Sequence, residues 1–258
     1  MQEKKVSPVF KVAKRLLKAV YPKMEAVGVE NLPDEPVLIV GNHSQMNGPI
    51  VCELHFPIDR YTWCNAQMLD PRQVPAYAYR DFWSQKPKYT LWFYKLLSHA
   101  IAHFAAFILN NANTIGVHHD AKIISTFRQT MACLQAGASV VVFPECDEKY
   151  NNILYNFQNG FVEVARLYHK KTGHELSFVP LYIAPKLKRF FFGKPIRFCA
   201  ANPAAEERER ITAYLMQEIT DIARSQPRHT VVPYRNIPRR LYPCNIPDEV
   251  NPDEKARR

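Results

Sequence analysis

The chain has 258 residues, of which 47% are apolar and 22% charged, and its formal net charge is +10. This length can bury a full hydrophobic core as one large domain or two small ones, and the ordinary composition excludes wholesale disorder. The excess of Lys and Arg indicates an anionic partner, which a membrane surface, a phosphorylated substrate or nucleic acid would each satisfy.

Glycine and cysteine patterns exclude several kinds of site. The 8 glycines are too widely spaced to form G-x-G-x-x-G or G-x-x-x-x-G-K, so the two common glycine-built phosphate cradles are excluded as motifs. The 6 cysteines form no C-x-x-C and no zinc-ligand spacing. We expect free thiols in a reducing compartment, no secretory signal at the N-terminus, and neither metal nor cofactor.

Residues 5–20 are predicted to form a basic amphipathic helix. Such a helix either lies on an anionic bilayer with its lysine stems snorkelling or packs its apolar stripe on the domain. The apolar residues at helical spacing are Val6, Val9, Phe10, Ala13, Leu16, Leu17 and Val20, and the basic ones are Lys4, Lys5, Lys11, Lys14, Arg15 and Lys18.

The next elements alternate between strand and helix. A buried apolar run, 36–40, predicts a strand and is followed by a helix over 49–55 with Pro49 at its first position. Residues 60–68 read as a second strand, and 69–87 as a loop with short helical pieces.

Residues 88–109 predict a long, very apolar helix. The nearest approach to a membrane span is 96–109, which contains Ser98, His99 and His103 and falls short of the roughly 18 apolar residues required, so we expect a core or interfacial helix. Lys95, His99 and His103 share one face. No acidic cluster accompanies the histidines, which favours a polar stripe over a metal site.

The remaining chain completes an α/β pattern. Strand–helix alternation predicts a mainly parallel sheet covered by helices on both faces. We expect a surface helix in 1–24, the α/β domain in 25–226 and a Pro-rich tail in 227–258 that wraps on the domain or stays irregular. The later strands are expected at 114–118, 138–143 and 176–183, with two further strands within 189–199 around Gly193-Lys194-Pro195, and the helices at 121–135 (after Asp120), 158–171 and 203–225.

Three motifs fall at the ends of predicted strands. They are the blocks 41–49 (GNHSQMNGP), 142–145 (VFPE) with 157–161 (FQNGF), and 178–183 (FVPLYI) with 193–196 (GKPI). In one parallel sheet these strand ends converge on one crevice, which is where open α/β sheets place ligands. There His43 is a candidate general base and Glu145 a polar anchor.

This ordered set of motifs, over roughly residues 25–225, resembles the glycerolipid acyltransferase family, whose best-known members acylate lysophosphatidic acid. The resemblance implies transfer of a fatty acyl group from acyl-CoA or acyl-carrier protein to a hydroxyl of a lysolipid or other glycerolipid. It implies His43 as the base that takes the hydroxyl proton. It also places Asn42, Glu145, Gly160, His118 and Pro180 in substrate-binding blocks.

The catalytic block departs from the family pattern H-x-x-x-x-D. Gly48 stands five residues after His43, where the family has the aspartate that orients the histidine. Asn47, one position earlier, is assigned to the catalytic set because it can hydrogen-bond the ring, although it supplies no charge. Glu53 or Asp59 could serve only if the fold brings one of them to the histidine.

The acceptor blocks also depart from the pattern. Cys146-Asp147-Glu148 replaces Gly-Thr-Arg, and His118-His119-Asp120 stands where an arginine is usual. Histidine is a weaker and pH-dependent substitute for the bidentate fork of arginine. The acceptor therefore either lacks a terminal phosphate monoester or is bound by another cation.

The sequence thus predicts a peripheral membrane acyltransferase at the cytoplasmic, inner face of the membrane, with an anionic membrane surface as partner. The alternative is an inactive or weakened lipid-binding protein of the same fold, because the acidic partner of His43 is missing. Nucleic-acid binding rests on charge alone, and no recognised motif supports it.

Overall fold

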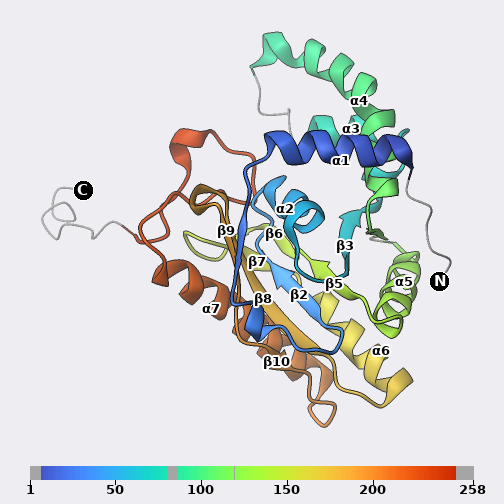
Figure 1. Ribbon diagram of the computed structural model, residues 1–258, viewed down its shortest axis with the longest axis vertical. Helices are drawn as coiled ribbons and strands as arrows, with labels where there is room; N and C mark the ends of the chain where they lie inside the picture. Colours follow the sequence, from blue (N-terminus) through green and yellow to red (C-terminus); the bar gives the residue numbers. More distant parts are fainter. Residues whose placement is uncertain (1–6, 81–86, 119, 248–258) are drawn as a thin grey trace, which may run out of the picture.

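The fold is built on a central sheet, seen in a computed structural model that describes residues 7–80, 87–118 and 120–247 (Figure 1). The 8-stranded sheet has the order β1-β9-β8-β2-β5-β3-β4, with β10 also paired to β8. Its strands are β1 (Glu25–Val27), β2 (Leu38–Gly41), β3 (Arg60–Asn65), β4 (Thr114–Val117), β5 (Ser139–Val142), β8 (Ser177–Ala184), β9 (Arg189–Phe192) and β10 (Ile196–Arg197).

The mainly parallel sheet expected from the sequence is confirmed. The five strands β8, β2, β5, β3 and β4 run parallel in this order, and β1 is parallel to β9. Only β9 and β10 pair antiparallel with β8 among the described strands. The central strands are continuous apolar runs because both faces of the sheet are covered.

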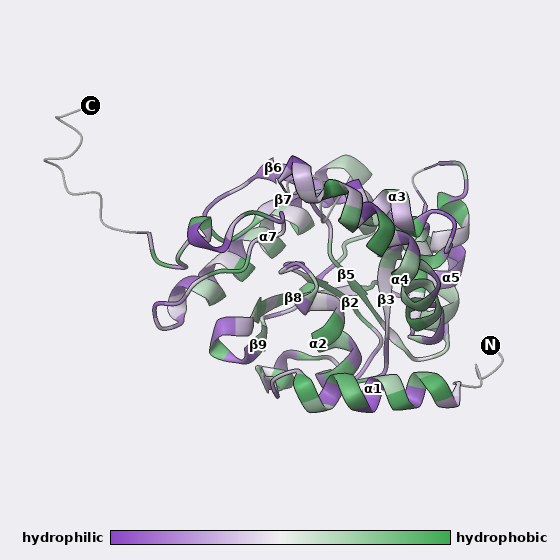
Figure 2. Cartoon of the chain, turned by 90° about the horizontal axis from the view of Figure 1, so that it is seen from above, coloured by the Kyte–Doolittle hydropathy of each residue, from purple (hydrophilic) through white to green (hydrophobic). Residues whose placement is uncertain are grey.

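Helices cover both faces, as predicted. One face packs on α5 (Ile123–Gln135), α6 (Glu163–Thr172) and α7 (Ala204–Ser225), through core residues such as Leu134, Val164 and Leu215. The other face packs on α2 (Asn47–His55) through Val51 and Cys52. Figure 2 shows α1 and α2 on one side of the sheet and α7 on the other.

Some element boundaries differ from the expected ones. Helix α2 begins at Asn47 rather than Pro49, and the strand expected over 60–68 ends at Asn65, where a 3-10 turn (Ala66–Leu69) follows. The sequence reading also missed β1 and a small hairpin, β6 (Glu145–Lys149) with β7 (Tyr155–Phe157). These strands are short or polar, so they carry no apolar alternation by which to recognise them.

Helix α1 (Pro8–Val20) confirms the predicted amphipathic helix; Lys4, Lys5 and Val6 lie outside the described residues. Its inner side buries Phe10, and the Lys14 ammonium lies 2.6 Å from the Glu53 carboxylate. The helix therefore packs on the domain, which is one of the two alternatives, and it also exposes a second apolar stripe; its binding to a bilayer stays a prediction. That stripe consists of Val9, Val12, Leu16 and Val20, which are 56–80% exposed.

Helix α4 (Leu91–Asn111) corrects one expectation. Together with the 3-10 turn Lys88–Thr90 it forms a 24-residue helix that is long and apolar enough to cross a membrane, whereas the sequence reading found no such stretch. The helix packs on α3 (Val74–Ala78) through Ala102 and Ala106 and extends away from the sheet (Figure 1). It leaves Trp92, Leu96 and Phe104 between 60% and 70% exposed.

Residues 227–247 of the Pro-rich segment wrap on the domain, which is the first of the two alternatives expected for this segment. Residues 248–258 lie outside the described part. Thr230 and Cys244 form an antiparallel bridge within it. The Asn245 side chain is fully buried and donates to the Ala223 carbonyl of α7 over 2.8 Å. The His229 ring lies 2.7 Å from the Tyr182 hydroxyl of β8.

Candidate active site

His43 and Glu145 meet at the carboxyl edge of the sheet. Strands β2 and β5 are parallel neighbours with Val40 opposite Val142, so the residues that follow them emerge side by side. One Glu145 carboxylate oxygen accepts a hydrogen bond from the His43 backbone N–H over 2.6 Å. The other accepts from the Tyr155 backbone N–H over 3.0 Å. The carboxylate therefore joins the β2–α2 loop to the β6–β7 hairpin.

Burial dominates the ionisation of Glu145. The residue is only 6% exposed, and removal from water raises the pKa of its carboxyl to about 7. The N–H groups of Tyr155 and His43 oppose this shift because they stabilise the charged form. Glu145 is thus a buried anchor for the loop that carries His43.

The loop itself has a constrained backbone. Ser44 and Gln45, directly after His43, adopt left-handed conformations with φ of 48° and 54°, which non-glycine residues rarely occupy. Just before the histidine, the Asn42 side chain accepts from the Ile183 N–H over 2.7 Å and donates to the Ile183 carbonyl over 3.1 Å. Asn42 therefore extends the β2–β8 pairing by one residue. Backbone strain of the kind found at Ser44 and Gln45 is concentrated at functional sites.

The His43 imidazole lies among aromatic rings. Its centroid is 5.2 Å from that of Phe143 and 5.9 Å from that of Tyr234, both in edge-on geometry. Its Nδ1 is buried and makes no hydrogen bond within the described part of the chain. Burial lowers the pKa of His43 below its ordinary value of 6.5, so the ring is neutral at pH 7 and able to accept a proton.

Gly48 is where the expected aspartate is missing, and the fold shows why no side chain is present there. A Cβ at this position would lie 2.6 Å from the His43 carbonyl oxygen and 2.9 Å from the Phe143 ring. Phe143 therefore occupies the space beside the histidine into which a side chain at position 48 would project.

The three residues considered as substitutes for the aspartate have other surroundings. Asn47 accepts from the Tyr21 hydroxyl over 2.9 Å and donates to the Ser44 carbonyl over 2.9 Å. Glu53 pairs with Arg60 at 2.8 Å and with Lys14. Asp59 precedes β3 and so lies at the amino edge of the sheet, opposite the edge that carries His43. The fold thus commits Asn47 and Glu53 to other partners and leaves Asp59 at the wrong edge.

The remaining predicted site residues are spread over the fold. His118 follows β4, three strand spacings or about 14 Å from β2 along the same edge. Gly160 is exposed in the 3-10 turn that leads into α6, and a Cβ there would meet nothing within 4 Å. Pro180 lies opposite Val40 inside β8 rather than at the strand end, and it contacts Gly193. The end of β8, which belongs to the third motif, therefore lies at the site, whereas Pro180 of the same motif does not.

The C-terminal segment contributes residues that the sequence reading did not assign to the site. Besides Tyr234, the backbone carbonyl of Arg235 and the hydroxyl of Tyr242 each accept a hydrogen bond from the Gln45 side chain, over 3.2 Å and 2.9 Å. The Arg235 guanidinium pairs with Asp147 of β6 at 3.3 Å. No local signal could have shown this, because about 190 residues separate the partners along the chain.

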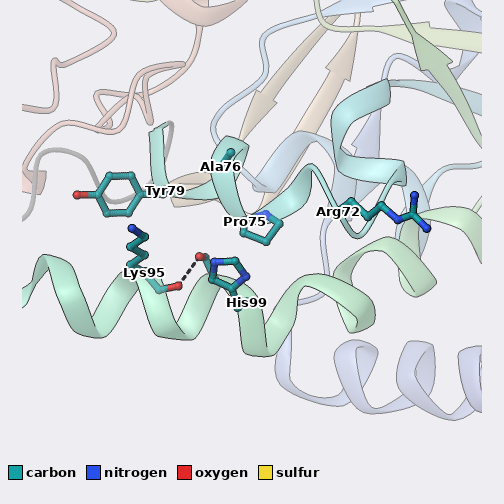
Figure 3. Close-up of a pocket in the computed structure, with 7 residues that line it drawn as sticks. Arg72, Pro75, Ala76, Tyr79, Lys95 and His99 are labelled. Atoms are coloured by element: carbon teal, nitrogen blue, oxygen red, sulfur yellow. Dashed lines mark hydrogen bonds between the residues drawn. The ribbon is translucent and has the colours of Figure 1, made fainter.

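A separate hollow of about 330 Å³ lies between α3 and α4. Lys95 and His99 project from α4 toward Tyr79, Ala76 and Pro75, and Arg72 lies at the far end (Figure 3). Ser98, fully buried, donates to the Lys95 carbonyl over 2.6 Å. Among the described residues that line it, Arg72 and Lys95 are basic and none is acidic, which makes this part of the hollow electropositive.

Comparison with known proteins found similarity in structure but no match in sequence. No protein-family model matches the sequence, and no curated protein matches it. The fold is similar to the crystal structure of the 1-acyl-sn-glycerophosphate acyltransferase PlsC from Thermotoga maritima. The TM-score is 0.48 with 16% sequence identity, over 85% of this chain and 79% of that chain.

Proposed function

We propose that this protein is an O-acyltransferase that moves a fatty acyl group from a thioester donor, acyl-CoA or acyl-carrier protein, to a hydroxyl of a glycerolipid or lysolipid. His43 is the general base. The observation that carries the proposal is the placement of a neutral imidazole at the carboxyl edge of a parallel sheet, on a strained loop anchored by buried Glu145.

The chemistry follows from that geometry. An alcohol is a poor nucleophile, so the imidazole takes its proton while the oxygen attacks the thioester carbonyl. The tetrahedral intermediate then collapses, the carbon–sulfur bond breaks, and the imidazolium returns the proton to the leaving thiolate. A lowered pKa keeps His43 in the form that starts this sequence.

One observation favours the second candidate, a lipid-binding protein with weakened or absent catalysis. The Nδ1 of His43 is unbonded in the described part of the chain, so no carboxylate stabilises the imidazolium that the reaction forms. In the serine-protease example, loss of that stabilisation lowers the rate by about 10⁴-fold. Slow turnover is therefore compatible with the site.

The exposed apolar faces of α1 and α4 support the further proposal that the protein associates with a membrane. The stripe Val9, Val12, Leu16 and Val20 is flanked by exposed Lys11, Arg15 and Lys18, a pattern suited to an anionic bilayer. The exposed Trp92 and Leu96 of α4 lie next to the electropositive hollow that Lys95 and His99 line. We place the protein at the cytoplasmic face of a membrane, where lysolipid acceptors reside.

The test is an acyl-transfer assay on vesicles with acyl-CoA or acyl-carrier protein and a panel of lysolipid and glycolipid acceptors. We expect transfer by the wild type, and loss of at least about 100-fold in His43→Gln with vesicle binding retained. Vesicle binding without transfer to any acceptor supports the lipid-binding alternative. Equal activity of the wild type and His43→Gln contradicts the assignment of the base.

A further inference from the structure

A continuous series of contacts starts at His43 and returns to it through three other residues. Its ring meets the ring of Tyr234, and Tyr234 meets the ring of Tyr155 with centroids 5.7 Å apart. The Tyr155 backbone N–H donates to Glu145, and Glu145 accepts from the His43 backbone N–H. Three separate segments of the chain thus hold one imidazole, the β2–α2 loop, the β6–β7 hairpin and the C-terminal segment.

The chain at Tyr234 is held by contacts with both the histidine loop and the hairpin. The neighbouring Arg235 accepts a hydrogen bond from Gln45 through its carbonyl and pairs with Asp147 through its guanidinium. Gln45 belongs to the histidine loop and Asp147 to the hairpin. The segment is held further along by the bond between Gln45 and the Tyr242 hydroxyl. These bonds of the neighbouring residues help to seat Tyr234 against the histidine.

The imidazole also meets the ring of Phe143, which fills the space next to Gly48. Its Nδ1 makes no hydrogen bond among the described residues, so the edge-on aromatic contacts bear on the rotation of the ring, alongside its interactions with the backbone of His43 and Gln45. We propose that Tyr234, together with Phe143, is the positioning residue that holds the His43 imidazole in the orientation for proton transfer, in place of a carboxylate. The catalytic part of this inference rests on the proposed function of His43.

The test compares Tyr234→Leu, which removes the ring but keeps an apolar side chain, with Tyr234→Phe, which keeps the ring. Tyr150→Leu is the matched control, because Tyr150 is an exposed tyrosine at the end of the same hairpin. We expect Tyr234→Leu to lower kcat about tenfold with KM little changed, the effect of losing one aromatic contact that acts on orientation. Tyr150→Leu should keep the wild-type kcat, and Tyr234→Phe should restore most of the kcat that Tyr234→Leu loses, because it keeps the ring.

A second readout does not depend on catalysis. The ring protons of His43, assigned in NMR spectra by their loss in His43→Gln, should shift in Tyr234→Leu and stay near their wild-type positions in Tyr234→Phe. Unchanged His43 signals and unchanged kcat in folded Tyr234→Leu overturn the proposal. If the wild type transfers no acyl group, the proposed function fails, and the NMR shifts alone then decide whether Tyr234 holds the ring.

Discussion

Gly48 and Phe143 pack so closely that a Cβ on Gly48 would lie 2.9 Å from the Phe143 ring, a distance at which one of them must move. The same Cβ would lie 2.6 Å from the His43 carbonyl oxygen, which is backbone and cannot turn away. The absence of an aspartate at position 48 therefore goes together with the packing of Phe143 beside His43, because the two side chains would compete for the same space.

Gly48→Ala is expected to destabilise the protein by about 1–3 kcal/mol because of this overpacking. Gly48→Asp should not restore a His–Asp pair and should be at least as destabilised, since its larger side chain meets the same atoms. Thermal or urea unfolding measures both. Gly160→Ala is the control, because its Cβ meets nothing within 4 Å, and its unfolding free energy should stay near that of the wild type. A stable Gly48→Asp with raised acyl-transfer activity contradicts this account.

Glu145→Gln is expected to loosen the histidine loop. Glutamine has one acceptor oxygen, so it can accept from His43 or from Tyr155 but not from both in the same way, and one buried N–H loses its partner. We expect a loss of about 1–3 kcal/mol in unfolding free energy together with reduced activity. Glu163→Gln, which alters an exposed i,i+3 ion pair with Arg166, is the control and should change stability by less than about 0.5 kcal/mol.

The difference in unfolding free energy between the wild type and Glu145→Gln should change with pH in one direction. The pKa of Glu145 is raised from 4.5 to about 7 on folding, so the folded state holds its proton more tightly. The stability contributed by this group is complete below pH 4.5 and is lost as the pH rises to about 7. The advantage of about 1–3 kcal/mol of the wild type over Glu145→Gln is therefore expected at pH 4.5, and it should disappear or reverse by pH 8, because the wild type loses about 3 kcal/mol over this range. A gap that is constant or widens with pH contradicts the raised pKa.

Glu53 is expected to be important for how α1 attaches to the domain. It pairs with Arg60, whose side chain is 7% exposed, and with Lys14 of α1. Glu53→Gln leaves a buried guanidinium without its charge partner and should cost about 3 kcal/mol or more. Lys14→Gln removes only the more exposed ion pair and should cost less than about 1 kcal/mol. Equal losses in the two variants would show that the buried Arg60 does not depend on Glu53.

The exposed apolar stripe of α1 is predicted to bind anionic vesicles. Leu16→Glu, at a position 65% exposed, should weaken sedimentation with phosphatidylglycerol vesicles several-fold without lowering the melting temperature. Trp92→Glu, at a position 70% exposed, tests the face of α4 in the same way. Ile246→Glu, a 39% exposed apolar residue in the C-terminal segment, is the control and should leave sedimentation unchanged. Wild-type sedimentation of all three variants contradicts membrane binding by these helices.

Sequence patterns alone predicted most of the sheet and the edge at which His43 and Glu145 meet. Apolar runs such as 36–40 and 138–143 identify buried strands, and parallel strands bring the residues that follow them to one edge, so both residues could be placed before any coordinates. Helical periodicity likewise predicted α1, α5 and α7 within a few residues.

The surroundings of the imidazole could not be predicted from sequence patterns. Tyr234 reaches His43 from nearly 200 residues away, the pairing of Glu53 with Lys14 depends on how α1 docks, and the space at Gly48 is filled by Phe143, which follows β5. Local pattern encodes which face of an element is apolar and where the element ends. It does not encode which distant side chain fills a given volume, because that depends on the close packing of all the segments together.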